Sequence, residues 1–245
     1  MDRSFRRGAT HLFHALGIGI AAFLISAALV EAAYAAVPTT RSVLKAAKVA
    51  IGKEPGVHIV SLASSGSSIL ERISADVGTT SGTETVSEGK ATLAVELTPT
   101  YAYIRGNSSG LTSLFGLSTA DAKKVGTHWE SFKAGTSQYS SLKPAVTTSS
   151  VTALFPSAKG TKLSTHVMNG AKLYVLKWTT AATSSLPELS NTFTFSTAGT
   201  ALPVKETSTA SGAQKVMTTF SAWGEQVRVR VPPRASTIAS SKIRG

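Results

Sequence analysis

The stretch KATLAVELTPTYAYIR, residues 90–105, has the clearest structural pattern in the chain. In its first half apolar side chains alternate with polar or small ones, which is typical of a β-strand with one buried face. The apolar members are Leu93, Val95 and Leu97. Pro99 cannot donate to a strand ladder, so we expect a turn there and a partner strand at residues 100–105. The stretch therefore predicts an antiparallel meander with one apolar face.

Strand and turn patterns continue on both sides of this meander. Before it we expect a helix over residues 42–51, capped by Ser42, and then three short strands. After it, Asn169-Gly170 is the strongest hairpin-turn dipeptide in the chain. The other expected strands cover residues 57–61, 68–77, 83–87, 162–167, 172–179, 192–196, 204–209, 214–221 and 227–231.

Between the two groups of strands lies a segment with helical signals. Ser118 and Asp121 fit a capping box for a short helix that Gly126 ends. Two more short helical pieces are expected at residues 138–143 and 151–155, each followed by a proline. The predicted fold class is α+β and mostly β, a curved antiparallel sheet covered by short helices.

The N-terminal region predicts export. Residues 15–30 read ALGIGIAAFLISAALV without a charge, after Arg3, Arg6 and Arg7 and before an A-x-A site at residues 33–35. This layout is that of a signal peptide over residues 1–35, and an uncleaved membrane anchor is the alternative. Both place the rest of the chain outside the cytoplasm. We then expect a linker at 36–41, one domain at 42–233 and a disordered tail at 234–245.

Composition excludes several classes of function. The chain has no cysteine, so it has no disulfide, no catalytic thiol and no thiol for lipid attachment. Its net charge is +12, but Lys and Arg are scattered and no basic stripe alternates with aromatic residues. Nucleic acid is therefore not an expected partner. A membrane surface is a possible one, because a basic protein is weakly attracted to anionic headgroups, although the charge also serves solubility.

The sequence contains residues of two kinds of chemical site, a serine nucleophile and histidine metal ligands. Residues 106–110, GNSSG, match the G-x-S-x-G motif, in which Ser108 would be the nucleophile with Asp121 and either His128 or His166. That motif needs a parallel α/β sheet, whereas this pattern is antiparallel, so a turn is expected and a serine hydrolase is the third-ranked function. His58, His128 and His166 stand alone, so we expect no metal site and no cofactor.

Several short motifs resemble the LprG/LppX-like envelope lipoproteins, which are distantly related to the LolA-like lipoprotein carriers. The resemblance spans residues 42–233. The motifs are GVHIV at 56–60, YIRGN at 103–107, LFGLS at 114–118, GTHW at 126–129, LPV at 202–204, FSAWGE at 220–225 and VPP at 231–233. Members that are lipoproteins carry a lipid-modified cysteine after the leader, and this chain has none.

The resemblance implies a half-barrel whose concave face and covering helices enclose an apolar cavity for acyl chains. The sequence does not fix the register of residues 101–104, so either Tyr101 and Tyr103 or Ala102 and Ile104 face that cavity. The expected lining residues are Leu93, Val95, Leu97, Tyr101, Tyr103, Ile104, Leu114, Phe115, Trp129, Leu154, Phe155, Leu173, Val175, Phe193 and Phe195.

The predicted function is non-enzymatic binding of a lipid or other amphiphile, for carriage or sensing in an envelope of the actinobacterial type. The alternative is a closed-core scaffold or sensor domain that acts through protein contacts. The two differ in whether the apolar face borders an open cavity or a filled core.

Overall fold

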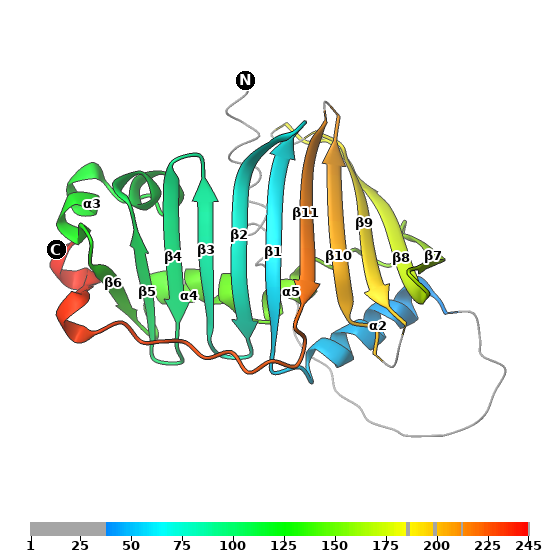
Figure 1. Ribbon diagram of the computed structural model, residues 1–245, viewed down its shortest axis with the longest axis horizontal. Helices are drawn as coiled ribbons and strands as arrows, with labels where there is room; N and C mark the ends of the chain where they lie inside the picture. Colours follow the sequence, from blue (N-terminus) through cyan, green and yellow to red (C-terminus); the bar gives the residue numbers. More distant parts are fainter. Residues whose placement is uncertain (1–37, 185–186, 198–199, 212, 245) are drawn as a thin grey trace.

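The computed structural model of the protein describes residues 38–184, 187–197, 200–211 and 213–244. These residues form a twelve-stranded sheet in the order β12-β6-β5-β4-β3-β2-β1-β11-β10-β9-β8-β7 (Figure 1). All neighbouring strands are antiparallel except β12 and β6. The predicted fold class, a mostly antiparallel curved sheet with short helices, is confirmed. The leader expected over residues 1–35 lies outside the described residues.

Most strands lie where the sequence patterns predict them, and several are longer at their ends. Their bounds are β1 Gly56–Ser65, β2 Ser68–Gly78, β3 Gly82–Glu88, β4 Ala91–Leu97, β5 Tyr101–Gly106, β6 Trp129–Lys133, β7 Lys162–Met168, β8 Ala171–Thr180, β9 Leu189–Ser196, β10 Pro203–Ala210, β11 Gln214–Ser221 and β12 Thr237–Ala239.

The hairpin of β4 and β5 forms as its alternation predicts. Leu97 pairs with Ala102, and Val95 pairs with Ile104, so these four side chains share one face of the sheet. The hairpin of β7 and β8 also forms as expected. Asn169 and Gly170 both have positive φ, 53° and 77°, which is the conformation that a two-residue hairpin turn requires.

The helices are short, and three of them, α2, α3 and α4, begin at a side-chain cap. The longest, α2 (Thr40–Ile51), begins at Thr39, whose side chain accepts from the Ser42 backbone while Ser42 caps Thr39 in return. Ser42 is therefore the third helical residue of a capping box, and the expected cap position was wrong. The others are α3 Thr119–Val125, α4 Ser137–Leu142, α5 Ser149–Ala153, the π-turn η1 Gly110–Leu114 and the 3₁₀ turn η2 Lys143–Val146. Among the described residues, no helix has the length and apolar character to cross a bilayer.

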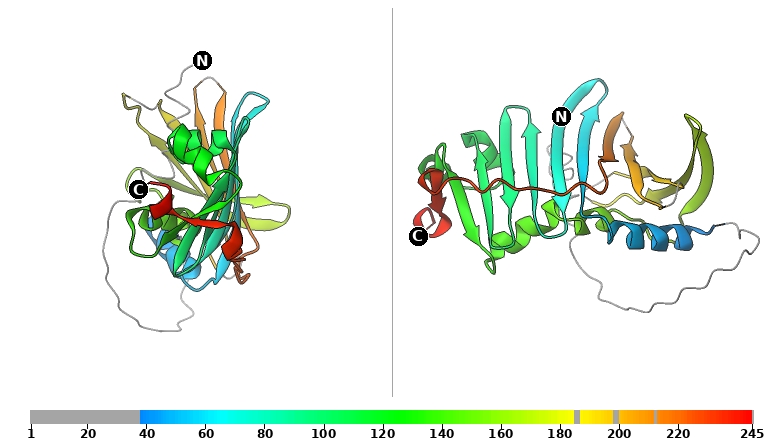
Figure 2. Two further views of the ribbon diagram at one scale, coloured as in Figure 1. Left: turned by 90° about the vertical axis from the view of Figure 1, so that its left-hand side faces the viewer. Right: turned by 60° about the horizontal axis from the view of Figure 1, so that its bottom comes forward.

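One face of the sheet, here called the helix-covered face, carries these helices (Figure 2). Two apolar clusters form on it. The first cluster lies over β2 to β6 and includes buried residues of η1, α3, α4 and η2, such as Leu111, Val125 and Leu142. The second cluster joins α2 to β1, β2, β8, β9 and β11. In α2 the buried positions are Val43, Leu44, Ala47, Ala50 and Ile51, which recur at helical spacing.

The opposite face is crossed by the chain that follows β11 (Figures 1 and 2). A strand was expected at residues 227–231, but no strand forms there. Val227 and Val229 are half-buried while Arg228 and Arg230 are exposed, so the alternation is real. It reflects a segment lying across the strands rather than pairing with them. Gly56 makes room for this segment, since a Cβ there would lie 2.6 Å from a Val227 methyl group.

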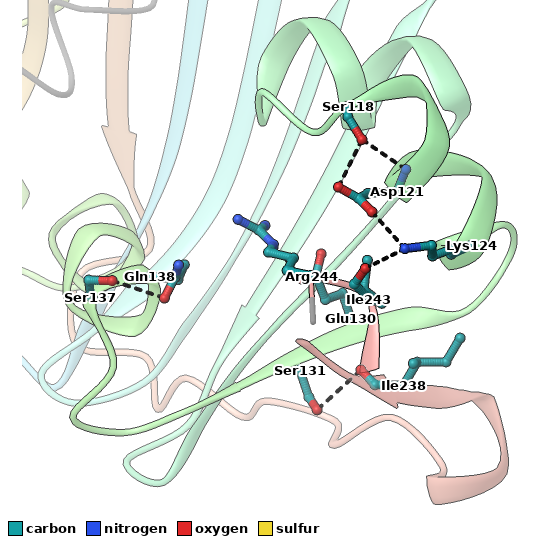
Figure 3. Close-up of polar contacts among 10 residues, drawn as sticks. All are labelled: Ser118, Asp121, Lys124, Glu130, Ser131, Ser137, Gln138, Ile238, Ile243 and Arg244. Carbon is teal, nitrogen blue, oxygen red and sulfur yellow. Dashed lines mark hydrogen bonds and ion pairs between the residues drawn. The ribbon is translucent and has the colours of Figure 1, made fainter. Parts of the chain in front are cut away.

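The C-terminal segment, expected to be disordered over residues 234–245, is folded onto the sheet as far as the structure describes it. After the 3₁₀ turn η3 (Arg234–Ser236), β12 pairs in parallel with β6, and η4 (Ser240–Lys242) follows. Ile243 is then buried in the first cluster. The Lys124 Nζ donates to the Ile243 carbonyl at 2.7 Å, and the Arg244 Nε donates to Glu130 Oε1 at 3.1 Å (Figure 3).

Candidate functional site

The helix-covered face is the candidate site, because it holds most of the apolar residues expected to bind a ligand. Leu93, Val95, Leu97 and Ile104 lie in the first cluster, with Leu114 and Phe115 packed against it. Val95 is 2% exposed and Leu97 is 0% exposed, so this wall is filled by the chain's own side chains. Close packing of this kind is that of a core.

Phe193 and Phe195 lie in the second cluster, where Leu154 and Phe155 pack against them. The ring of Phe155 is 5.4 Å from the rings of both Phe193 and Phe195 and meets them edge to face. Phe220 adds a further ring 5.8 Å from Phe193. This geometry is favourable for aromatic packing and fixes α5 against β9.

The other expected lining residues lie on the opposite face. Tyr103 pairs with Glu96 and Ser131, so the register turns Ala102 and Ile104, not Tyr101 and Tyr103, toward the helices. Trp129 also lies on the opposite face, with the guanidinium of Arg105 4.6 Å from its ring centre. Leu173 pairs with Ser196 and Val175 with Thr194, again opposite to Phe193 and Phe195. Of the two registers left open for residues 101–104, the one with Ala102 and Ile104 toward the helices is found. Trp129, Leu173 and Val175 do not share a face with the other expected lining residues, and whether any of the expected residues lines a ligand cavity stays a prediction.

Sequence reasoning missed a group of half-buried side chains on the helix-covered face of β7, β8 and β11. They are Leu163, Tyr174, Trp178 and Val216. In β8 the side chains on both faces of the strand are apolar. One alternating set is Tyr174, Leu176 and Trp178, and the other contains Leu173 and Val175. Periodicity alone therefore could not tell which set faces the helices.

A row of polar side chains crosses the same face between these apolar residues. The Thr218 hydroxyl donates to Ser61 Oγ at 3.1 Å, and the Ser208 hydroxyl donates to Asn191 Oδ1 at 2.7 Å. Glu206 pairs with Thr218 on one side and with Phe193 on the other. We call this set the polar row; its members are Ser61, Asn191, Glu206, Ser208 and Thr218, and all are buried.

Burial changes the ionisation of carboxyl groups on this face. It raises the pKa of Glu206 from 4.5 to about 7. Burial and the neighbouring charge of Glu71 likewise raise the pKa of the half-buried Glu84 to about 7. Both shifts have the sign expected for a carboxylate that loses water without gaining a cation.

The G-x-S-x-G segment is a structural connection between β5 and η1. The Asn107 side chain holds it to β4: its Oδ1 accepts from the Thr92 and Gly110 backbones, and its Nδ2 donates to the Lys90 carbonyl. A Cβ at Gly110 would overlap the Thr92 carbonyl oxygen, so this glycine is needed for the close crossing. A helical turn does follow Ser108, which was not expected.

No catalytic triad assembles around Ser108. Asp121 accepts from Ser118 and Lys124, and the Ser118 hydrogen bond lowers the pKa of Asp121. His128 Nδ1 lies 3.3 Å from the Val125 carbonyl, and His166 is on β7 at the far edge of the sheet. In the described part of the chain no hydrogen bond joins Ser108 to a histidine. The described residues also contain no group of His, Asp or Glu that could hold a metal ion.

A cavity of about 710 Å³ lies beside this loop on the opposite face, lined by residues that include Thr92, Arg105, Ser108 and Thr127. A second cavity of about 330 Å³ lies at the strand ends between Gly52, Thr79 and Val227. Leu93 is the expected acyl-chain residue that borders the larger cavity, and the smaller one has none. An open cavity on the helix-covered face therefore stays a prediction.

The fold and this face define a class of protein: a one-sheet protein with an apolar, helix-covered face interrupted by a buried polar row. Among solved structures, the chain is similar to the lipoprotein LppX of Mycobacterium tuberculosis, with a TM-score of 0.48 and 14% sequence identity over 78% of this chain and 98% of that one. No protein-family model matches the sequence, and no curated protein matches it.

Proposed function

We propose that this protein is exported and binds a lipid or other amphiphile by burying its acyl chains against the helix-covered face. The observation that carries the proposal is the half-buried apolar group Leu163, Tyr174, Trp178 and Val216, which the described helices leave partly uncovered. Burial of acyl surface contributes about 25 cal/mol per Å², so binding needs no catalytic group. The leader-like residues 1–35 support export to the cell envelope.

The acyl chains belong at the β7 to β11 end of the sheet in this proposal. Both clusters are closely packed at their centres, and the second cluster is bordered by the half-buried aromatic side chains Tyr174 and Trp178 and by Leu163. Loading would require movement of a cover, and the elements at this end are short: α5 is a single turn. The ring contacts that Phe155, just after this turn, makes with Phe193 and Phe195 would have to break for loading.

A scaffold or sensor with a closed core is the second candidate. The observation favouring it is the complete burial of Leu97 and Ile104 by the chain's own side chains. In that case partners would contact the surface of a chain whose net charge is +12.

The test is extraction of long-chain lipids from neutral vesicles by the purified chain, with bound lipid identified by native mass spectrometry. Binding of lipids in a fixed ratio, retained through gel filtration, is the expected result. A chain that emerges free of lipid and does not remove it from vesicles would favour the closed-core scaffold.

A further inference from the structure

Glu206 has no partner for its charge. It is 9% exposed, and no hydrogen bond or ion pair reaches its carboxylate in the part of the chain that the structure describes. A buried carboxylate without a cation is costly, and buried polar groups in native proteins are normally hydrogen-bonded. The neighbouring hydroxyls do not donate to the Glu206 carboxylate, since Thr218 donates to Ser61 and Ser208 donates to Asn191.

The two faces of the sheet also differ in charge. Strand carboxylates gather on the helix-covered face, where the register places Glu71, Glu84, Glu88, Glu130 and Glu206. Asp76 and Glu96 are the strand carboxylates on the opposite face among the described residues. Most strand cations lie on that opposite face: Arg72, Arg105, Lys133, Lys162, Lys177, Lys205 and Lys215. Lys172, beside the β7–β8 turn, is the exception.

We propose that the polar row is a headgroup site for a cationic amphiphile, in which an ammonium group binds Glu206 and the acyl chain lies along the second cluster. This inference rests on the function proposed above and specifies its ligand class. The ammonium supplies the hydrogen-bond donors that Glu206 lacks, and its chain continues toward the half-buried Trp178 and Val216, which pair with Asn191 and Ser208 of the polar row.

An anionic headgroup does not fit this site. A phosphate or carboxylate beside Glu206 would place two like charges in a buried setting, which is strongly unfavourable. Except for Lys172 beside the β7–β8 turn, the cations of the strands, which would attract such a group, lie on the other side of the sheet. A neutral sugar could donate hydroxyl hydrogens to Glu206 but would leave its charge uncompensated.

The experiment compares amphiphiles that share one chain and differ in headgroup: dodecylammonium, dodecyl maltoside and dodecanoate. Each is titrated below its micelle concentration into the full chain and into Glu206→Gln, followed by calorimetry at physiological salt. The control variant is Glu96→Gln, which removes a carboxylate from the opposite face. Circular dichroism establishes that each variant is folded.

We expect the wild type to prefer dodecylammonium over dodecyl maltoside by about tenfold or more, as a charge-assisted hydrogen bond would give. Glu206→Gln should remove that preference and Glu96→Gln should keep it. Binding of the maltoside without a preference for the ammonium, or a preference that survives Glu206→Gln, would overturn the headgroup site and leave the proposed function standing. If no amphiphile binds, both proposals fail.

Discussion

At the scale of single residues, Glu206 combines burial with a titratable group. Its folded pKa of about 7 lies above its ordinary 4.5, so the folded chain holds this proton more tightly than the unfolded chain does. Stability from this group is therefore fully present below pH 4.5 and is lost as the pH rises through 7. Glu84 titrates in the same range with the same sign.

We predict that Glu206→Gln is more stable than the wild type at pH 8 by about 3 kcal/mol and similar to it at pH 4.5. Glutamine cannot ionise, so the variant escapes the cost of a buried charge. Urea unfolding at several pH values measures this. Part of the decline should persist in the variant because Glu84 remains. Parallel pH curves for the two proteins would show that Glu206 is solvated.

At the scale of elements, the loop from β5 into η1 gives the G-x-S-x-G motif at residues 106–110 a structural reason. Its glycines and Asn107 are there because the chain crosses β4 closely at Thr92. Ser108, by contrast, is exposed, and no side-chain hydrogen bond holds it among the residues that the structure describes.

We predict that Gly110→Ala destabilises the fold by about 1–3 kcal/mol, because the new methyl group must displace the Thr92 backbone. Ser108→Ala should change the free energy of unfolding by less than about 0.5 kcal/mol. Chemical unfolding of both variants measures this. Labelling of wild-type Ser108 by a fluorophosphonate would instead support the serine hydrolase function.

The C-terminal segment is the second element whose structural role is defined. It covers the edge of β6, buries Ile243 and brings Arg244 to Glu130, whose side chain is 0% exposed. Arg244 also lies over the rings of Phe115 and Phe132, at 5.4 and 5.5 Å. Within the described part of the chain the other oxygen of Glu130 has no hydrogen-bond partner, so the carboxylate depends on Arg244 there.

We predict that Arg244→Gln destabilises the protein by about 3 kcal/mol, since it leaves a charge buried without its partner. The control is Asp76→Asn, which removes the largely exposed ion pair with His58 and should cost less than about 1 kcal/mol. Thermal unfolding compares the two. Equal effects would mean that Glu130 is hydrated once the segment is altered.

At the scale of the whole molecule, two faces of one sheet have different roles. The helix-covered face is apolar and bears carboxylates, whereas the opposite face bears cations and the chain after β11. Val216 and Met217 are neighbours on β11, both half-buried, and they lie on different faces.

We predict that Val216→Asn reduces extraction of long-chain lipid severalfold, because it places an amide where acyl chains lie in the proposal. Met217→Asn should leave extraction unchanged. Vesicle extraction assays with folded variants measure this. If both variants lose extraction equally, the ligand does not distinguish the faces.

What could be derived from the sequence is set by the range of the interactions involved. The strands, the β7–β8 turn and the one-sided β4–β5 hairpin depend on neighbours a few residues apart, and in β4 a single alternating set is apolar. The order of the strands in the sheet depends on longer contacts, and only the general antiparallel class could be anticipated.

Only the tertiary structure decided the register of β8, the fate of the C-terminal segment and the polar row. In β8 both alternating sets are apolar, so packing against β9 had to choose between them. Residue Ser131 meets Ile238 across 107 positions, and Ser61 meets Thr218 across 157. In sequence each of these residues is an isolated polar or apolar side chain. They become a site or a covered edge only when the sheet places distant strands side by side.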